Sequence, residues 1–218
     1  MENVVRFRGA VCLLGRFPAL AGVDFDVSAG EIVLLQGPNG AGKTTVLRAC
    51  AGLVPVVAGE VTVLGTDLRT RRRAVRGRVG LVGHDTGLYE DLTIADNLQF
   101  WTRASRGRQA DADAAIARLG LDGRLTQIPV ARLSAGQRKR ASLAVLLARR
   151  PRLWLLDEPH AALDREGRDL IDALMLEAVD AGATVMFVSH ELDRAHGVAH
   201  RSIELAGGMA RTPAVSLG

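Results

Sequence analysis

Short apolar runs alternate along the chain with segments that repeat apolar residues every three or four positions. The runs at 32–35, 153–156 and 183–188 are almost continuously apolar, which is typical of parallel strands covered on both faces. Between the last two runs, residues 164–179 carry the helical repeat, which stops before Gly182. This alternation predicts an α/β domain with a mainly parallel sheet.

The middle of the chain has a different pattern. From about residue 93 to 149 the sequence shows helical segments separated by glycines and a proline, and no convincing strand. We therefore expect a helical insertion, and we expect the opening stretch to supply a small antiparallel sheet. The predicted organisation is one domain over 1–218, with an α/β core at about 1–92 and 150–218 and a helical subdomain at about 93–149.

Composition adds few constraints. The chain has 218 residues and a net charge of +4, shows no signal-peptide pattern, and contains no apolar run long enough to cross a bilayer. Its two cysteines, Cys12 and Cys50, suit a reducing cytoplasm. Two of the 28 basic residues, Lys43 and Lys139, are lysines. Such a bias toward arginine is weak support for a nucleic-acid partner, so none is expected.

Residues 37–45 match the phosphate-loop pattern G-x-x-x-x-G-K-[ST], between a predicted strand and a predicted helix. Glycines allow the backbone to wrap around a phosphate chain and to point its N–H groups inward. Lys43 is expected to reach the β- and γ-phosphates and to take part in catalysis, and Thr44 is expected to offer its hydroxyl to Mg²⁺. The predicted nucleotide-binding residues of this loop are Gly37, Pro38, Asn39, Gly40, Ala41, Gly42, Lys43, Thr44 and Thr45.

An acidic pair, Asp157 and Glu158, follows the apolar run 153–156. In a phosphate-loop protein, a carboxylate at such a strand end can hold Mg²⁺, which suits Asp157. Glu158 is then placed to orient or deprotonate the attacking water. An acidic pair alone is more commonly a helix cap or a solvated feature, but the phosphate loop in the same chain favours the catalytic interpretation.

His190 leaves the carboxyl end of the predicted strand at 183–188, at the edge where parallel sheets bind ligands. We expect it to donate a hydrogen bond to the γ-phosphate and to help hold the water near Glu158. With the exception of His84, the remaining histidines are expected to be mostly polar surface positions; these are His160, His196 and His200.

A second phosphate-binding element is predicted at residues 133–137, where Leu-Ser-Ala-Gly-Gln opens a helical run. Ser134 is a natural N-cap, and a helix N-terminus with a hydroxyl and small residues can bind phosphate. Taken alone, this pattern is more commonly just a helix cap.

Together the motifs resemble those of ATP-binding cassette (ABC) ATPases, in the same order and at roughly the same spacing, over nearly the whole chain. The residues that carry the resemblance are the phosphate loop 37–45, the Leu-Ser-x-Gly-Gln signature at 133–137, the pair Asp157-Glu158, the loop 162–164 and His190.

The resemblance implies hydrolysis of ATP with Mg²⁺ by a head-to-tail homodimer, in which ATP lies between the phosphate loop of one subunit and the signature of the other. Ser134, Gly136 and Gln137 would then bind nucleotide across the interface, and Asp164 would couple the two sites. Two positions depart from the family pattern. His84 stands where a glutamine usually joins the magnesium shell, so it is a candidate metal ligand. Leu14, with Phe17 nearby, stands where an aromatic ring usually stacks on adenine, so apolar contact is expected instead.

Within the family, the sequence is similar to the ATP-binding subunits of haem exporters in cytochrome c biogenesis. The similar segments are Gly83-His84, 92–93, 96–100, 134–137 and 151–159. This resemblance implies ATP-powered export, with integral-membrane permease subunits that hold the chain at the cytoplasmic face of the cell membrane. The docking groove is expected near residues 84–89. A subunit of a drug, lipid or peptide exporter is the main alternative.

Two other classes of protein account for parts of the sequence. A soluble ABC ATPase that acts on DNA or ribosomes finds its best support in the arginines between residues 69 and 78. A basic solvated turn, or contact with anionic lipid headgroups, explains these arginines equally well. A non-hydrolysing binding module is rejected because all the catalytic residue types are present, unless His84 proves disabling.

Overall fold

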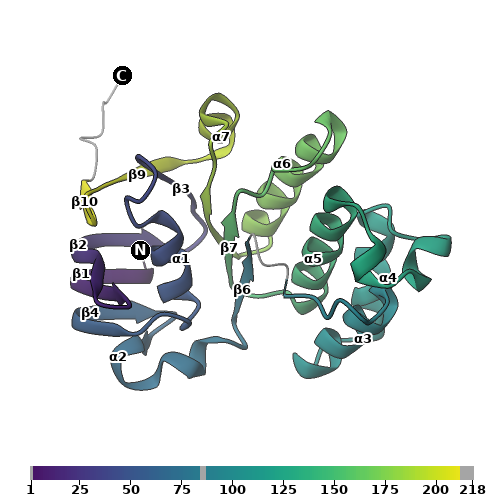
Figure 1. The fold of residues 1–218 in the computed structure, drawn as a ribbon, viewed down its shortest axis with the longest axis horizontal. Coiled ribbons are helices and arrows are strands. Elements are labelled where there is room, and N and C mark those ends of the chain that lie inside the picture. Colours follow the sequence, from purple (N-terminus) through teal and green to yellow (C-terminus); the bar gives the residue numbers. More distant parts are fainter. Residues whose placement is uncertain (1, 84–86, 212–218) are drawn as a thin grey trace.

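Two β-sheets pack together, and a group of helices forms a second lobe beside them (Figure 1). The structure, a computed structural model, describes residues 2–83 and 87–211. In chain order its elements are β1 (Asn3–Leu14), β2 (Phe17–Ser28), β3 (Ile32–Gln36), α1 (Lys43–Cys50), β4 (Val56–Val63), β5 (Thr66–Asp67), α2 (Leu68–Arg71), the 3-10 helix η1 (Arg72–Val75), β6 (Val79–Val82), α3 (Ile94–Ala104), α4 (Gln109–Arg118), η2 (Gly123–Gln127), η3 (Val130–Arg132), α5 (Ala135–Arg149), β7 (Leu153–Asp157), α6 (Arg165–Asp180), β8 (Thr184–Val188), α7 (Leu192–Val198), β9 (Arg201–Ala206) and β10 (Met209–Arg211).

The larger sheet contains the parallel strands, in the order β10-β9-β3-β8-β7-β6, with β10 antiparallel to β9 at one edge. The smaller sheet, β2-β1-β4-β5, is antiparallel throughout. Both features were expected, so the predicted α/β fold with a mainly parallel sheet and an N-terminal antiparallel sheet is confirmed.

The central strands of the larger sheet each contribute to two hydrophobic cores, because alternate side chains of a strand point to opposite faces. Val33 and Leu35 of β3 join the core that includes α1 and the smaller sheet. Ile32 and Leu34 join the core that includes α5 and α6. Strands β7 and β8 divide their residues in the same way. Burial on both faces is the reason why these strands are continuously apolar in sequence.

Helix α1 lies three residues earlier than the sequence pattern predicts. The apolar pattern after the phosphate loop predicts a helix over residues 46–53, whereas the helix begins at Lys43 and ends at Cys50. The backbone N–H of Gly52 donates to the Ala49 carbonyl at 2.8 Å, and this hydrogen bond closes the turn at the end of the helix. The earlier start brings Lys43 into the first turn of the helix, directly after the phosphate loop.

Both cysteines belong to the core. Cys12 and Cys50 are free thiols and are fully buried. Burial raises the pKa of both thiols, that of Cys12 to about 11. Because the reactive species of cysteine is the thiolate, this environment makes both side chains packing groups rather than nucleophiles.

Helices α3, α4 and α5 form the helical lobe. Thr93 and Asp96 cap α3 reciprocally: the Thr93 hydroxyl accepts from the Asp96 N–H at 3.1 Å, and the Asp96 carboxylate accepts from the Thr93 N–H at 3.2 Å. The buried Asn97 amide donates to the Tyr89 carbonyl at 3.0 Å and accepts from the Tyr89 N–H at 2.8 Å. These bonds fix the segment that enters the helical lobe.

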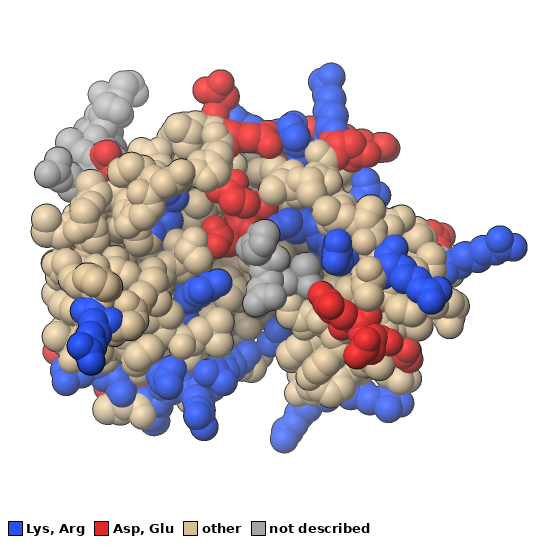
Figure 2. Space-filling view, viewed as in Figure 1, with Lys and Arg blue, Asp and Glu red and all other residues tan. Residues whose placement is uncertain are grey.

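Arginines gather between residues 69 and 78, along α2, η1 and the turn that follows, on the lower left edge of the view in Figure 2. Part of the group is structural. Arg78 donates to the Leu64 carbonyl at 3.0 Å and to the Thr66 hydroxyl at 2.7 Å, and Arg76 donates to the Gly52 carbonyl at 3.0 Å. Arginines that satisfy nearby loop carbonyls support the interpretation of this segment as a basic solvated turn.

Because side chains of β3 are buried in both cores, replacing one of them with a smaller residue should destabilise the protein. Leu34→Ala should lower the free energy of unfolding by about 2–5 kcal/mol, because Leu34 is fully buried and its loss leaves a cavity. Leu176→Ala makes the same chemical change at a side chain 46% exposed on α6, and should change stability by less than about 0.5 kcal/mol. Urea denaturation followed by circular dichroism checks both; equal losses would contradict the description of the core.

Candidate active site

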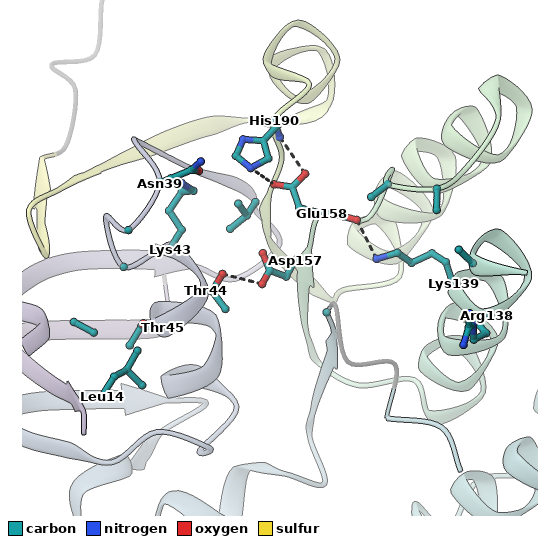
Figure 3. A pocket seen from close by; sticks show the side chains of 18 of the residues that line it. Leu14, Asn39, Lys43, Thr44, Thr45, Arg138, Lys139, Asp157, Glu158 and His190 are labelled. Carbon is teal, nitrogen blue, oxygen red and sulfur yellow. Dashed lines mark hydrogen bonds and ion pairs between the residues drawn. The ribbon is translucent and has the colours of Figure 1, made fainter. Parts of the chain in front are cut away.

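A cavity of about 890 Å³ opens between the sheets and the helical lobe, and most of the predicted site residues surround it (Figure 3). From the phosphate loop, Asn39, Gly40, Gly42, Lys43, Thr44 and Thr45 line the cavity. Asp157, Glu158 and His190 line it from the strand ends opposite. Gly37 and Pro38 line an adjoining cavity of about 330 Å³ together with Lys43 and His190. Ala41 is buried and is outside the lining of both cavities.

The phosphate loop is held close to strands of both sheets, which explains two of its glycines. Gly37 adopts a φ of +137°, and a Cβ there would lie 2.0 Å from the Leu205 carbonyl oxygen of β9. Gly42 adopts a φ of +100°, and a Cβ there would lie 2.7 Å from the Ala19 carbonyl oxygen of β2. Any larger residue would clash with backbone at these points. The loop conformation therefore depends on both sheets.

Lys43 is enclosed by the loop that precedes it. Its side chain is only 8% exposed, and its ammonium donates to the Gly37 carbonyl at 2.7 Å and the Pro38 carbonyl at 3.0 Å. Because Lys43 begins α1, the positive N-terminal end of that helix lies beside the ammonium. This arrangement concentrates positive charge and N–H donors in a way that suits a phosphate chain.

Thr44 and Asp157 meet across the cavity, although they lie far apart in the sequence. The Thr44 hydroxyl donates to the Asp157 carboxylate at 2.8 Å. A hydroxyl and a carboxylate are hard oxygen ligands of the kind that Mg²⁺ prefers, so this pair fits a magnesium ion. His84, the third predicted metal ligand, lies outside the residues that the structure describes.

Glu158 has an unusual backbone, and its carboxylate lies beside His190. Its φ is +50°, in the left-handed region that non-glycine residues rarely adopt. One carboxylate oxygen accepts from the His190 backbone N–H at 3.1 Å. The other lies 3.4 Å from His190 Nε2, and is buried without a hydrogen-bond partner among the described residues. The Glu158 side chain as a whole is 31% exposed and lines the cavity, so a water molecule can reach the carboxylate, which suits the role of a general base.

The signature residues form a helix cap, and most of them are outside the lining of the cavity of their own chain. The Ser134 hydroxyl accepts from the Gln137 N–H at 3.2 Å, and the Gln137 side chain accepts from the Ser134 N–H at 3.0 Å. Gly136 lies close to the loop between β7 and α6, since a Cβ on Gly136 would lie 2.8 Å from the Ala162 carbonyl oxygen. Of the signature, Ala135 lines the cavity, whereas Ser134, Gly136 and Gln137 are outside its lining.

Asp164 caps a helix, whereas the two candidate adenine contacts, Leu14 and Phe17, are exposed. The Asp164 carboxylate accepts from the Gly167 N–H at 2.8 Å and so caps α6. Leu14 is 51% exposed and lines the cavity, where it presents an apolar surface. Phe17 is exposed and is outside the lining of this cavity.

His160 differs from the expectation that it would be a polar surface residue. It is 1% exposed, and its Nε2 lies 2.8 Å from an Asp172 carboxylate oxygen on α6. Arg194 of α7 pairs with the same carboxylate. The loop after Glu158 folds back beneath α6, which buries His160; a local sequence pattern cannot report such a long-range contact.

Lys139 is the site residue for which the sequence suggested no role. It lines the cavity from α5, and its ammonium donates to the Glu158 carbonyl at 3.0 Å. Burial lowers the pKa of the Lys139 ammonium, while the nearby charges of Asp157 and Glu158 raise it. The signal in the sequence was its rarity, since lysine occurs at only two positions of this arginine-rich chain.

Comparisons with known proteins agree with this geometry. The family model described as ABC transporter matches residues 20–161. The cytochrome c biogenesis ATP-binding export protein CcmA of Rhodopseudomonas palustris (strain BisB18) is 40% identical over 92% of this chain and 96% of that protein. The protein of the same name in Vibrio cholerae serotype O1 is 37% identical over 78% of this chain and 82% of its own length. A solved structure described as a dimeric bacterial ABC transporter cassette, MJ0796, is 25% identical, with a TM-score of 0.86 over 95% of this chain and 98% of that one.

The chain belongs to the ABC transporter family, as a subunit that binds and hydrolyses ATP. Within that family, its curated relatives at 35–40% identity are cytochrome c biogenesis ATP-binding export proteins. The predicted family, enzyme class and subfamily resemblance are therefore confirmed.

The enclosure of Lys43 predicts that arginine cannot replace it. Lys43→Arg should raise the dissociation constant for ATP by about tenfold or more, because the broad guanidinium does not fit the loop and loses its charge-assisted hydrogen bonds. Arg48→Lys, the reverse exchange at an exposed position of the same helix, should bind ATP as the unmodified protein does. Titration with a fluorescent ATP analogue checks both variants. Unchanged affinity in Lys43→Arg would contradict this account of the loop.

Proposed function

We propose that this chain is the ATP-hydrolysing subunit of an exporter that serves cytochrome c assembly, with haem or a haem-related molecule as the transported substrate. The observation that carries the proposal is the 40% identity with a cytochrome c biogenesis ATP-binding export protein over 92% of this chain. The rival assignment, a subunit of a drug, lipid or peptide exporter, has the same ATPase site and differs in the membrane partner.

The hydrolytic roles are assigned from the contacts in the cavity. Lys43 would exchange its two carbonyl partners for phosphate oxygens when ATP binds, at the positive end of α1. Thr44 and Asp157, already in contact, would hold Mg²⁺. The ion, when bound, would neutralise charge on the phosphates.

Glu158 is assigned as the base that orients the attacking water and takes its proton. The partial exposure of its carboxylate in the cavity supports this role, and one carboxylate oxygen is fixed by the His190 N–H. The His190 ring, exposed at the mouth of the cavity, would donate to the γ-phosphate and hold the same water. Both residues act from strand ends that the sheet holds side by side.

The position of the signature supports a head-to-tail homodimer. Ser134, Gly136 and Gln137 lie at the N-terminus of α5, outside the cavity lining of their own chain. They would therefore contact the ATP of a second copy, whose signature would complete the first site. A structural relative at 25% identity is described as a dimeric cassette, which agrees with this arrangement.

Permease subunits would hold the protein at the cytoplasmic face of the membrane. Within residues 2–83 and 87–211, no helix has the length and apolarity needed to cross a bilayer. Tyr89 and Phe100 are exposed and lie with ring centroids 5.0 Å apart at the start of the helical lobe. An exposed aromatic pair at the start of the helical lobe suits an apolar segment of a permease.

The role of Glu158 can be tested by one substitution. Glu158→Gln should retain ATP binding but lose about 10²–10⁴-fold in turnover, because the amide cannot accept the proton. ATP should then accumulate at the interface and hold the dimer together, as size-exclusion chromatography would report. Glu60→Gln, at an exposed position of β4, is the matched control and should hydrolyse ATP normally. Hydrolysis by Glu158→Gln at the rate of the unmodified protein would refute the assignment.

The transport assignment predicts a specific membrane partner. A tagged chain purified from detergent-solubilised membranes of its own host should carry a permease of cytochrome c assembly, identified by mass spectrometry, together with haem absorbance. Tyr89→Ala should reduce this recovery while ATP binding is retained, and Leu176→Ala should recover the complex normally. Recovery of a drug-exporter permease alone would overturn the haem assignment.

A further inference from the structure

Lys139 is a buried cation that the assigned ATPase roles do not use. It lies in the first turns of α5, directly after the signature, and is only 8% exposed. Its neighbours Arg138 and Arg140 on the same helix remain partly exposed. Burying an ammonium is costly unless hydrogen bonds and nearby opposite charges compensate it. At Lys139 the compensation comes from the Glu158 carbonyl, at 3.0 Å, and from the charges of Asp157 and Glu158.

The partner of Lys139 is the backbone of the proposed base itself. Glu158 holds a left-handed φ of +50°, a conformation that a non-glycine residue keeps only where the surroundings stabilise it. Its N–H donates to the Val188 carbonyl of β8 at 3.0 Å, and its carbonyl accepts from Lys139. The two peptide groups that flank its Cα are therefore both held, one by the sheet and one by α5, and Figure 3 shows the bond from Lys139.

This geometry determines where the carboxylate points. With both adjoining peptides held, the side chain lines the cavity, reaches the His190 N–H with one oxygen and keeps the other 3.4 Å from His190 Nε2. Without the bond from Lys139, the peptide after Glu158 could rotate toward a more common conformation. The carboxylate would then move away from the water that it must orient, and a misplacement of about 1 Å can cost about 10²-fold in rate.

We propose that Lys139 is a positioning residue for Glu158, and that it links the hydrolytic site to the signature on the same helix. Ser134 and Gln137 stand at the start of α5 and would contact the partner's ATP, while Lys139, farther along the helix, holds the base of its own site. A shift of α5 on binding of the partner's nucleotide would therefore be transmitted to Glu158. The proposal rests on the ATPase function proposed above.

The test is steady-state ATP hydrolysis by purified Lys139→Met and Lys139→Arg. Methionine keeps the length and burial of the side chain but cannot donate a hydrogen bond, so kcat should fall about ten- to hundredfold while KM and ATP affinity change less than about threefold. Arginine keeps a charged donor of sufficient reach and should restore kcat to within about threefold of the unmodified protein. Arg73→Met, which removes an exposed charge from η1, is the control and should be fully active.

A second measurement separates positioning from a general loss of structure. In the Glu158→Gln background, Lys139→Met should cause no further loss of the residual single-turnover rate, because the group that it positions is already disabled. ATP binding by each variant reports that the nucleotide site is folded. If Lys139→Met does not fold, Lys139→Leu, which also cannot donate a hydrogen bond, replaces it with the same expected fall in kcat.

Three results would overturn the proposal: normal turnover in the methionine variant, equal losses in the methionine and arginine variants, or a full further loss in the Glu158→Gln background. None of these bears on the ATPase function itself. That function would instead fail if the unmodified protein did not hydrolyse ATP, or if Glu158→Gln hydrolysed it normally.

Discussion

The burial of β3, β7 and β8 on both faces is the constraint on which the site depends. Because these parallel strands share one sheet, their carboxyl ends lie together at one edge. Gly37 follows β3, Asp157 ends β7, and His190 follows β8. The two cores keep the strands in register and leave no freedom to slide, so residues from three distant parts of the sequence meet around one cavity.

The proposed base shows how a site residue is held by long-range contacts. Glu158 is one residue beyond the end of β7, and its left-handed backbone is stabilised by a carbonyl of β8 and by the ammonium of Lys139. Behind it, His160 is buried against Asp172 of α6. The sheet, α5 and α6 thus converge on one short loop. A conformation that would be strained in isolation becomes the stable one there.

The scarcity of lysine acquires a physical meaning in this arrangement. Both lysines of the chain are buried to the same extent at the cavity, and both donate to backbone carbonyls. At Lys43 the surrounding loop leaves room for a slender stem with a compact charge but not for a guanidinium, whereas Lys139 faces the wider cavity. Arg76 and Arg78, just after η1, satisfy loop carbonyls nearer the surface instead. At the phosphate loop, the residue type therefore follows the space that is available.

The sequence by itself determined the fold class, the phosphate loop, the strand ends that carry Asp157 and His190, and the family, because each is encoded by local spacing and periodicity. It also predicted two sheets and a helical middle segment. The tertiary structure decided what local patterns cannot report: the end of α1, the burial of His160, which signature residue lines the cavity, and the bond from Lys139 to Glu158. These features depend on contacts between residues distant in the chain, and such contacts exist only when both cores are packed.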